Sequence, residues 1–323
     1  MSTGASISAI EKPPPGPVHS FFFNSAELRA GWRLVIFLLV LIPLFVAVEV
    51  FVFVLRRRGS IPDSVPILND LITASLIFIT TAVMAIIEKR DLADYGLPLR
   101  ECLGRRFWLG AVFGLVTMTM VVAAMHVAGV IAFSKGTVQG QALATYATFA
   151  AITFVFGAMF EELTCRGYLL FTLTTGFGFW PAALVSSAIF GLLHAGNQGE
   201  TAFGCFSTGV FGFLFCVLLR RTGNLWMPIG FHAAYNWAES FFYGTTDSGF
   251  LAHDRFLTVE VSGSRWLTGG SAGPEGSVLC VAIVLLLTIG VGFGMRGARF
   301  PDVTALKMNP RPAPEPDLPP VTS

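Results

Sequence analysis

The sequence predicts an all-α, polytopic membrane helix bundle with about eight transmembrane helices. Three observations support this fold class. Of the 323 residues, 54% are hydrophobic and 13% are charged, whereas charged residues make up about a quarter of an average soluble chain. The mean hydropathy is +0.68. Apolar runs of about 18 residues or more, each long enough to cross a bilayer, recur along the chain. An ordinary soluble domain is therefore excluded.

Charge and cysteine content exclude further classes of protein. The formal net charge is +1, so the chain lacks the basic field that nucleic-acid binding requires, and we expect no nucleic-acid partner. The five cysteines are scattered and form no C-x-x-C pair, so neither a disulfide framework nor a thiolate metal site is indicated.

The expected elements follow the apolar runs in order. The polar start of the chain contains EKPPPGP and lacks the short apolar core and cleavage site of a signal peptide, so the first run is expected to be a retained helix. The expected spans are 34–55, 67–87, 107–133, 143 onward through the Glu161 region, 179–194, 203–219, 225–242 and 277–295.

This order of spans divides the chain into six regions. Three helices precede a core of four, and one helix follows a long loop. The C-terminal tail is rich in proline and is expected to be disordered. The regions are an N-terminal tail (1–30), the first three helices (31–142), the four core helices (143–243), a loop (244–276), the last helix (277–297) and the C-terminal tail (298–323).

Basic residues predict the orientation, because short loops rich in Lys and Arg tend to stay in the cytoplasm. With eight alternating spans, most of the 21 Lys and Arg residues fall on the side that holds both termini. The cluster Arg56–Arg58 falls on the other side, against this trend. We expect a multi-pass integral membrane protein with both termini cytoplasmic. The 244–276 loop is then non-cytoplasmic, and its alternating FLTVEV stretch could form a short hairpin or a re-entrant cover.

Ionisable residues inside membrane helices are costly, so each one needs a partner or a function. Glu162 and Arg166 are four positions apart on one helix and are expected to form an internal ion pair. Glu161 points about 100° away from Glu162 and lacks that partner. It is therefore a candidate general base, and a structural hydrogen bond to a neighbouring helix is the alternative.

The turn signals place Glu161 and two histidines at one depth. The first strong break after Glu161 is TGFGFWP, so its helix runs on for about 20 Å, and the next helix returns about 22 Å to reach His194. His232 lies about 10 Å into a later helix that starts on the same side. A single intramembrane histidine more often makes a structural hydrogen bond between helices, but three level groups favour a site.

Asn236 and Glu239 extend the face of the helix that carries His232. His232 and Asn236 are four apart and share a face, and both can donate hydrogen bonds to one oxygen, as a developing oxyanion requires. Glu239 lies seven positions past His232. We expect it to support the site by lining the same cavity, or alternatively to bond Tyr235 or a loop.

Three motifs in the second half of the chain resemble those of the CPBP family of intramembrane proteases. This family is also known as the type II CAAX prenyl endopeptidase or Abi family. Each motif alone is weak, but together, in order and on apolar segments, they are specific, and the resemblance covers about residues 143 to 243. The motifs are E-E-x-x-x-R (Glu161 to Arg166), F-x-x-x-H (Phe190 to His194) and H-x-x-x-N (His232 to Asn236).

The resemblance implies an endopeptidase that acts on a membrane-associated protein or peptide. Glu161 and His194 would activate a water that attacks a peptide carbonyl. His232 and Asn236 would stabilise the oxyanion, and the ion pair described above would support the site. Cys165 falls in a variable slot of the first motif, so we interpret it as a small packing residue and not as a nucleophile.

Metal dependence and two rival functions stay open. No H-E-x-x-H motif is present, but Glu161, His194 and His232 could form a two-histidine, one-carboxylate zinc site. A water activated by Glu and His needs no metal, so no cofactor is certain. The rivals are a proton-coupled transporter and an inactive family member that acts as a scaffold or immunity protein. Transporters usually carry paired repeats, which are not evident in this sequence.

Overall fold

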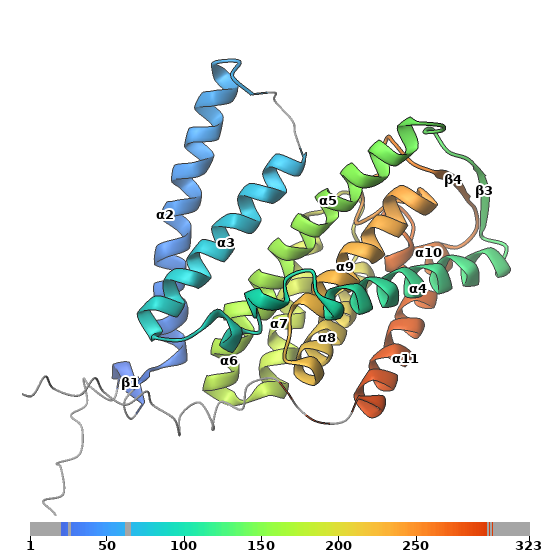
Figure 1. Ribbon diagram of the computed structural model, residues 1–323. Helices are drawn as coiled ribbons and strands as arrows, with labels where there is room; N and C mark the ends of the chain where they lie inside the picture. The colour runs from blue at the N-terminus through green and yellow to red at the C-terminus, as the bar shows by residue number, and fades with distance from the viewer. Residues whose placement is uncertain (1–20, 25–26, 62–65, 296, 298, 300–323) are drawn as a thin grey trace, which may run out of the picture.

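In the computed structural model, the described part of the protein is a bundle of helices with two short antiparallel strand pairs (Figure 1). Most of the two expected tails lies outside the described residues, so the disorder expected at the C-terminus stays a prediction. The structure describes residues 21–24, 27–61, 66–295, 297 and 299.

Eight apolar helical segments in the described chain match the eight expected spans in order. Six are long and apolar enough to cross a membrane by length and composition. The other two are α11, with 17 residues, and α9, which has 12 residues before it widens into a π turn. The segments are α2 (Ala30–Arg57), α3 (Pro66–Glu88), α4 (Arg105–Val127), α5 (Ala142–Glu162) continued by η3 (Leu163–Tyr168) and α6 (Leu169–Phe177), α7 (Phe179–Leu193), α8 (Ala202–Thr222), α9 (Trp226–Trp237) continued by η5 (Ala238–Tyr243), and α11 (Val278–Gly294).

The third expected span, 107–133, ends earlier than predicted. Helix α4 stops at Val127, and strand β3 (Ile131–Lys135) follows it. This strand pairs antiparallel with β4 (Leu257–Val261), so the FLTVEV stretch does form a strand. Its partner comes from the α4–α5 connection and not from its own loop. Local alternation predicts a strand, but it carries no information about a partner that is distant in sequence.

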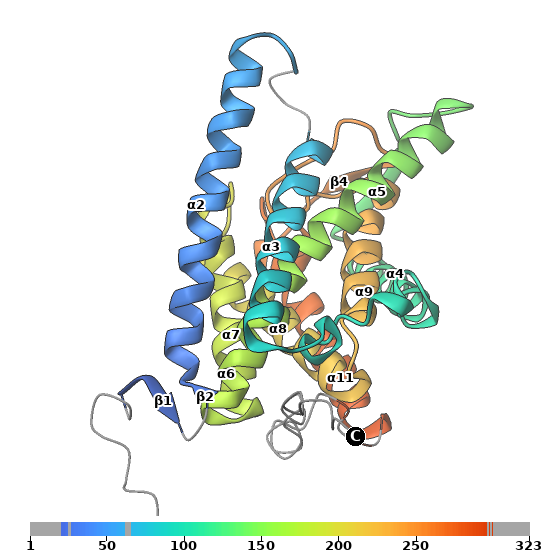
Figure 2. The same ribbon diagram turned by 60° about the vertical axis from the view of Figure 1, so that its left-hand side comes forward.

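Helices α2 and α3 form a pair at one flank of the bundle (Figures 1 and 2). The guanidinium of Arg33, at the start of α2, donates to Glu88 at the end of α3 through Nε at 2.8 Å. Glu88 also accepts from the hydroxyls of Tyr95 and Tyr168. Because Tyr168 belongs to η3, this network ties the pair to the central helices.

The remaining short elements are β1 (Phe23–Asn24), β2 (Glu27–Leu28), η1 (Leu92–Tyr95), η2 (Leu99–Glu101), η4 (His194–Gly196), α10 (Arg265–Thr268) and η6 (Pro274–Gly276).

Helix α9 packs between α4 and α5, and glycines allow its close approach to α4. A Cβ on Gly110 would lie 2.0 Å from the carbonyl oxygen of Met227, and a Cβ on Gly114 would lie 2.1 Å from that of Phe231. Gly230 of α9 meets α4 in the same way. Small residues four positions apart, like Gly110 and Gly114, are typical of membrane helix interfaces, where packing drives association. This interface holds in place the helix that carries His232.

We expect Gly114→Ala to lower the unfolding free energy by about 1–3 kcal/mol, because the added methyl group overpacks the contact with α9. In a helix without such a contact, the same change gains about 0.5–1 kcal/mol. Gly290→Ala on α11 is the matched control, since a Cβ there meets nothing within 4 Å. Thermal unfolding in detergent measures both variants. Equal melting of the two would contradict the close contact.

Candidate active site

The helix that carries the E-E-x-x-x-R motif is interrupted directly after the two glutamates. Helix α5 ends at Glu162, and the chain widens into the π turn η3, where Gly167 leaves the helical region with ψ −117°. Helix α6 then continues to Phe177, and Gly178, at φ 88°, starts the return. The expected continuation past Glu161 and the expected break are thus both present. π turns of this kind occur frequently at functional sites.

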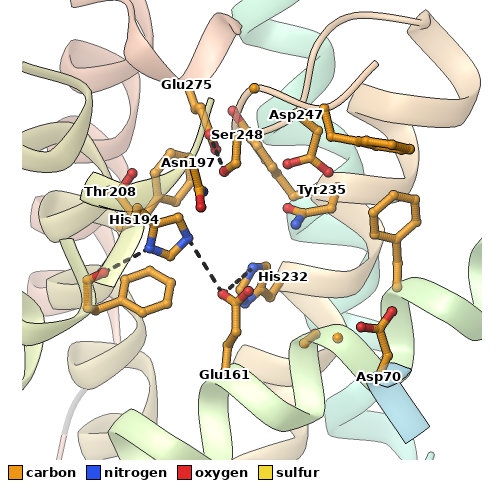
Figure 3. Close-up of a pocket in the computed structure, with 18 of the residues that line it drawn as sticks. Asp70, Glu161, His194, Asn197, Thr208, His232, Tyr235, Asp247, Ser248 and Glu275 are labelled. Atoms are coloured by element: carbon orange, nitrogen blue, oxygen red, sulfur yellow. Dashed lines mark hydrogen bonds and ion pairs between the residues drawn. The ribbon is translucent and has the colours of Figure 1, made fainter. Parts of the chain in front are cut away.

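Glu161, His194 and His232 meet at one point, as their predicted depths require (Figure 3). The Oε2 atom of Glu161 lies 3.9 Å from Nε2 of His194 and 3.6 Å from Nε2 of His232. This oxygen is buried and has no hydrogen-bond partner among the described residues. Both separations exceed a direct hydrogen bond, so a small group such as a water can lie between the three side chains.

Each histidine is oriented by a hydrogen bond at its other ring nitrogen. Nδ1 of His194 lies 2.8 Å from the carbonyl oxygen of Phe190, one turn back on α7. Nδ1 of His232 lies 3.0 Å from Oε1 of Glu162. Because both partners are acceptors, each Nδ1 carries a proton. Nε2, which faces Glu161, is then an acceptor in a neutral ring and a donor in a protonated ring.

The expected ion pair between Glu162 and Arg166 is present, and both side chains are fully buried. Nη1 of Arg166 lies 3.1 Å from Oε1 of Glu162, and the guanidinium lies over the ring of Phe190, 4.0 Å from its centre. Glu162 accepts from His232 as well. The pair therefore holds two helices of the site in register and fixes the ring of His232.

The three groups open into a cavity of about 450 Å³ that Asn236 also lines. Glu239 is not among the residues that line this cavity, so the first of its two expected placements is wrong. From Ala238 the helix widens into the π turn η5, so a seven-residue spacing no longer returns to the same face. The carboxylate of Glu239 lies instead with those of Asp247 and Glu275.

Sequence reasoning did not find several polar residues that line the cavity. Asp70 stands within the apolar run of α3, where the cost of burying a carboxylate was a usable signal. Asn197 follows His194 by three residues, and the other three residues belong to the 244–276 loop, which folds back over the cavity from a distant part of the chain. No local pattern marks them. The residues missed are Asp70, Asn197, Asp247, Ser248 and Glu275.

The donor set of the site fits a zinc ion as well as a water. Zinc accepts two histidine nitrogens and one carboxylate oxygen and leaves a position open in its catalytic sites. Histidine ligands of zinc typically donate their second ring nitrogen to a carbonyl or a carboxylate. Here His194 has a carbonyl as this acceptor and His232 has a carboxylate. Oε2 of Glu161 has no hydrogen-bond partner among the described residues. Glu161, His194 and His232 are therefore the residues that could hold a metal.

A carboxylate and two imidazoles converge from three separate apolar helical segments. This arrangement defines a polytopic membrane protein with a polar chamber inside its helix bundle. Residues 143–238 match the family model for type II CAAX prenyl endopeptidase Rce1-like proteins, so this chain carries a domain of that family, as its motifs predict. The match runs from α5 into η5 and includes all four candidate catalytic residues. Comparison with curated proteins finds no match.

Proposed function

We propose that the protein is an intramembrane endopeptidase that hydrolyses a peptide bond of a membrane-associated protein or peptide. The observation that carries this proposal is the convergence of Glu161 Oε2 with Nε2 of His194 and of His232. The family match supports the same reaction class. The charge pattern favours both termini in the cytoplasm, which would place the reaction near that face.

In the proposed reaction, Glu161 and His194 position a water between them. Glu161 takes a proton from the water as its oxygen attacks the peptide carbonyl carbon. The carbonyl oxygen becomes an oxyanion that accepts hydrogen bonds from the amide of Asn236 and from Nε2 of protonated His232. The acid formed at Glu161 then returns its proton to the leaving amine. The buried setting strengthens these polar interactions, because little water competes for them.

A zinc ion is compatible with the same residues. If bound, it would be held by Glu161, His194 and His232, and it would lower the pKa of a coordinated water. In either case, the hydrogen bonds to Phe190 and Glu162 orient the two rings.

The test is cleavage of a peptide library by the full chain in liposomes, with products identified by mass spectrometry. Specific products support a protease, and their absence would contradict it and favour an inactive scaffold. Chelator treatment forms a second arm. Loss of cleavage that zinc restores would establish the metal mechanism, whereas unchanged cleavage favours water activated by Glu161 and His194. A proton-coupled transporter would instead move protons across the liposome membrane without generating products.

We expect Asn236→Ala to lower kcat by about 10²–10³-fold with little change in KM, because it removes a donor that acts mainly on the oxyanion. Asn69→Ala is the control, since Asn69 is an exposed amide on α3 that accepts from Arg56. Steady-state cleavage kinetics measure both variants. Equal rates for the two would remove Asn236 from the mechanism.

A further inference from the structure

Three buried carboxylates lie together next to the catalytic cavity, and the proposed reaction uses none of them. Glu239 comes from η5, and Asp247 and Glu275 come from near the two ends of the 244–276 loop. One carboxylate oxygen from each residue lies within 4.8 Å of the other two. Asp247 and Glu275 also line the catalytic cavity (Figure 3), so two of the three carboxylates form part of its wall.

Glu239 lacks the partners that a buried carboxylate requires. Its side chain is fully buried, and neither carboxylate oxygen makes a hydrogen bond within the described residues. The backbone amide of Glu275 lies nearby without reaching hydrogen-bond geometry. Burying an unpaired carboxylate is costly. This group therefore requires a partner, such as a cation, that the rest of the described chain does not supply.

The two loop carboxylates give the same indication. Burial raises the pKa of Asp247 well above its ordinary value, and the nearby charges of Glu275 and Glu161 raise it further. Burial also raises the pKa of Glu275, although a hydrogen bond from Ser248 opposes the shift. Three such groups cannot all stay ionised at this distance unless a positive charge joins them.

We propose that Glu239, Asp247 and Glu275 bind a divalent cation of the Ca²⁺ type, which joins the two ends of the 244–276 loop to η5 beside the catalytic cavity. An all-oxygen donor set is typical of hard cations. Ca²⁺ binds oxygens at about 2.3–2.6 Å, so ligand atoms up to about 5 Å apart can share one ion, whereas Mg²⁺ allows only about 4 Å. The three ligand atoms lie within 4.8 Å of one another, a range that Ca²⁺ covers in full.

Backbone contacts show that the loop is already folded to present these ligands. Gly273, at φ 117°, passes so close to Thr246 that a Cβ there would lie 2.0 Å from the carbonyl oxygen of Thr246. The amide of Gly249 donates to the carbonyl of Ala272 at 3.0 Å. The loop ends are therefore fixed against each other, so an ion at this point would meet preformed ligands and lose little chain entropy on binding.

The test is Ca²⁺ binding to the purified full chain in detergent after removal of bound metal. We expect calorimetry to detect one Ca²⁺ per chain, thermal unfolding to shift upward by several degrees at saturating CaCl₂, and protease cleavage within the loop to slow. MgCl₂ should give a smaller shift. Glu239→Gln should weaken Ca²⁺ binding by at least about tenfold, because fewer charged ligands lower the affinity.

Asp247→Asn is a second variant with the same expected loss, in case Glu239→Gln folds poorly. Glu260→Gln is the matched control, because Glu260 is an exposed carboxylate on β4 of the same loop. Glu161→Gln should retain Ca²⁺ binding, which separates this site from the proposed catalytic one. Absence of binding by the wild type, or equal binding by wild type and Glu239→Gln, would overturn the proposal and leave three carboxyls that share protons.

Discussion

Glu161→Gln is expected to abolish peptide cleavage, with a loss in kcat of at least about 10³-fold. The carboxylate is placed to take the proton of a water between His194 and His232, at 3.9 and 3.6 Å from their Nε2 atoms. General base catalysis typically contributes about 10²–10⁴-fold, and glutamine keeps the shape of the side chain without a basic oxygen. Cleavage of the library peptide identified for the wild type measures the effect.

The substitution should leave folding intact, which separates a catalytic from a structural role. Glu161 Oε2 has no hydrogen-bond partner in the described structure, so the neutral amide should cost little stability. Glu49→Gln is the matched control, because Glu49 is a carboxylate on α2 that does not line the cavity. Cleavage by Glu161→Gln at the rate of the control would refute the proposed mechanism.

Arg166→Met is expected to have the largest effect on stability. It leaves Glu162 as a buried charge with only His232 as partner, and breaking a buried pair in this way costs about 3–5 kcal/mol. The arginine also loses its position over the Phe190 ring. Chemical or thermal unfolding in detergent measures the change. Arg265→Met, at an exposed arginine on α10, is the control with no expected loss.

Replacing both members of the pair separates stability from activity. Glu162→Leu combined with Arg166→Met removes both buried charges, so much of the lost stability should return. Cleavage should not return, because Nδ1 of His232 then lacks the carboxylate 3.0 Å away that orients its ring. If the double variant were as active as the wild type, the ring would not depend on Glu162.

The sequence predicts the helical segments and most of the candidate site because each depends on local pattern. Apolar runs must be helical in a bilayer, since every backbone group has to be paired within its own segment. Helical rise and the break near Gly178 then give the depths of Glu161 and His194 by simple addition. The spacing of four between Glu162 and Arg166 is likewise a property of one helix.

Tertiary structure decides the contacts that helical rise and residue spacing cannot predict. The π turn from Ala238 removes Glu239 from the cavity, because a widened turn changes which residues share a face. The pairing of β3 with β4 and the placement of Asp247 and Glu275 over the cavity depend on contacts between distant segments. The sequence by itself determined which side chains stand on which helix and at what depth. Only the folded bundle decided which loop residues join them, since chain closure over long separations leaves no local periodicity to detect.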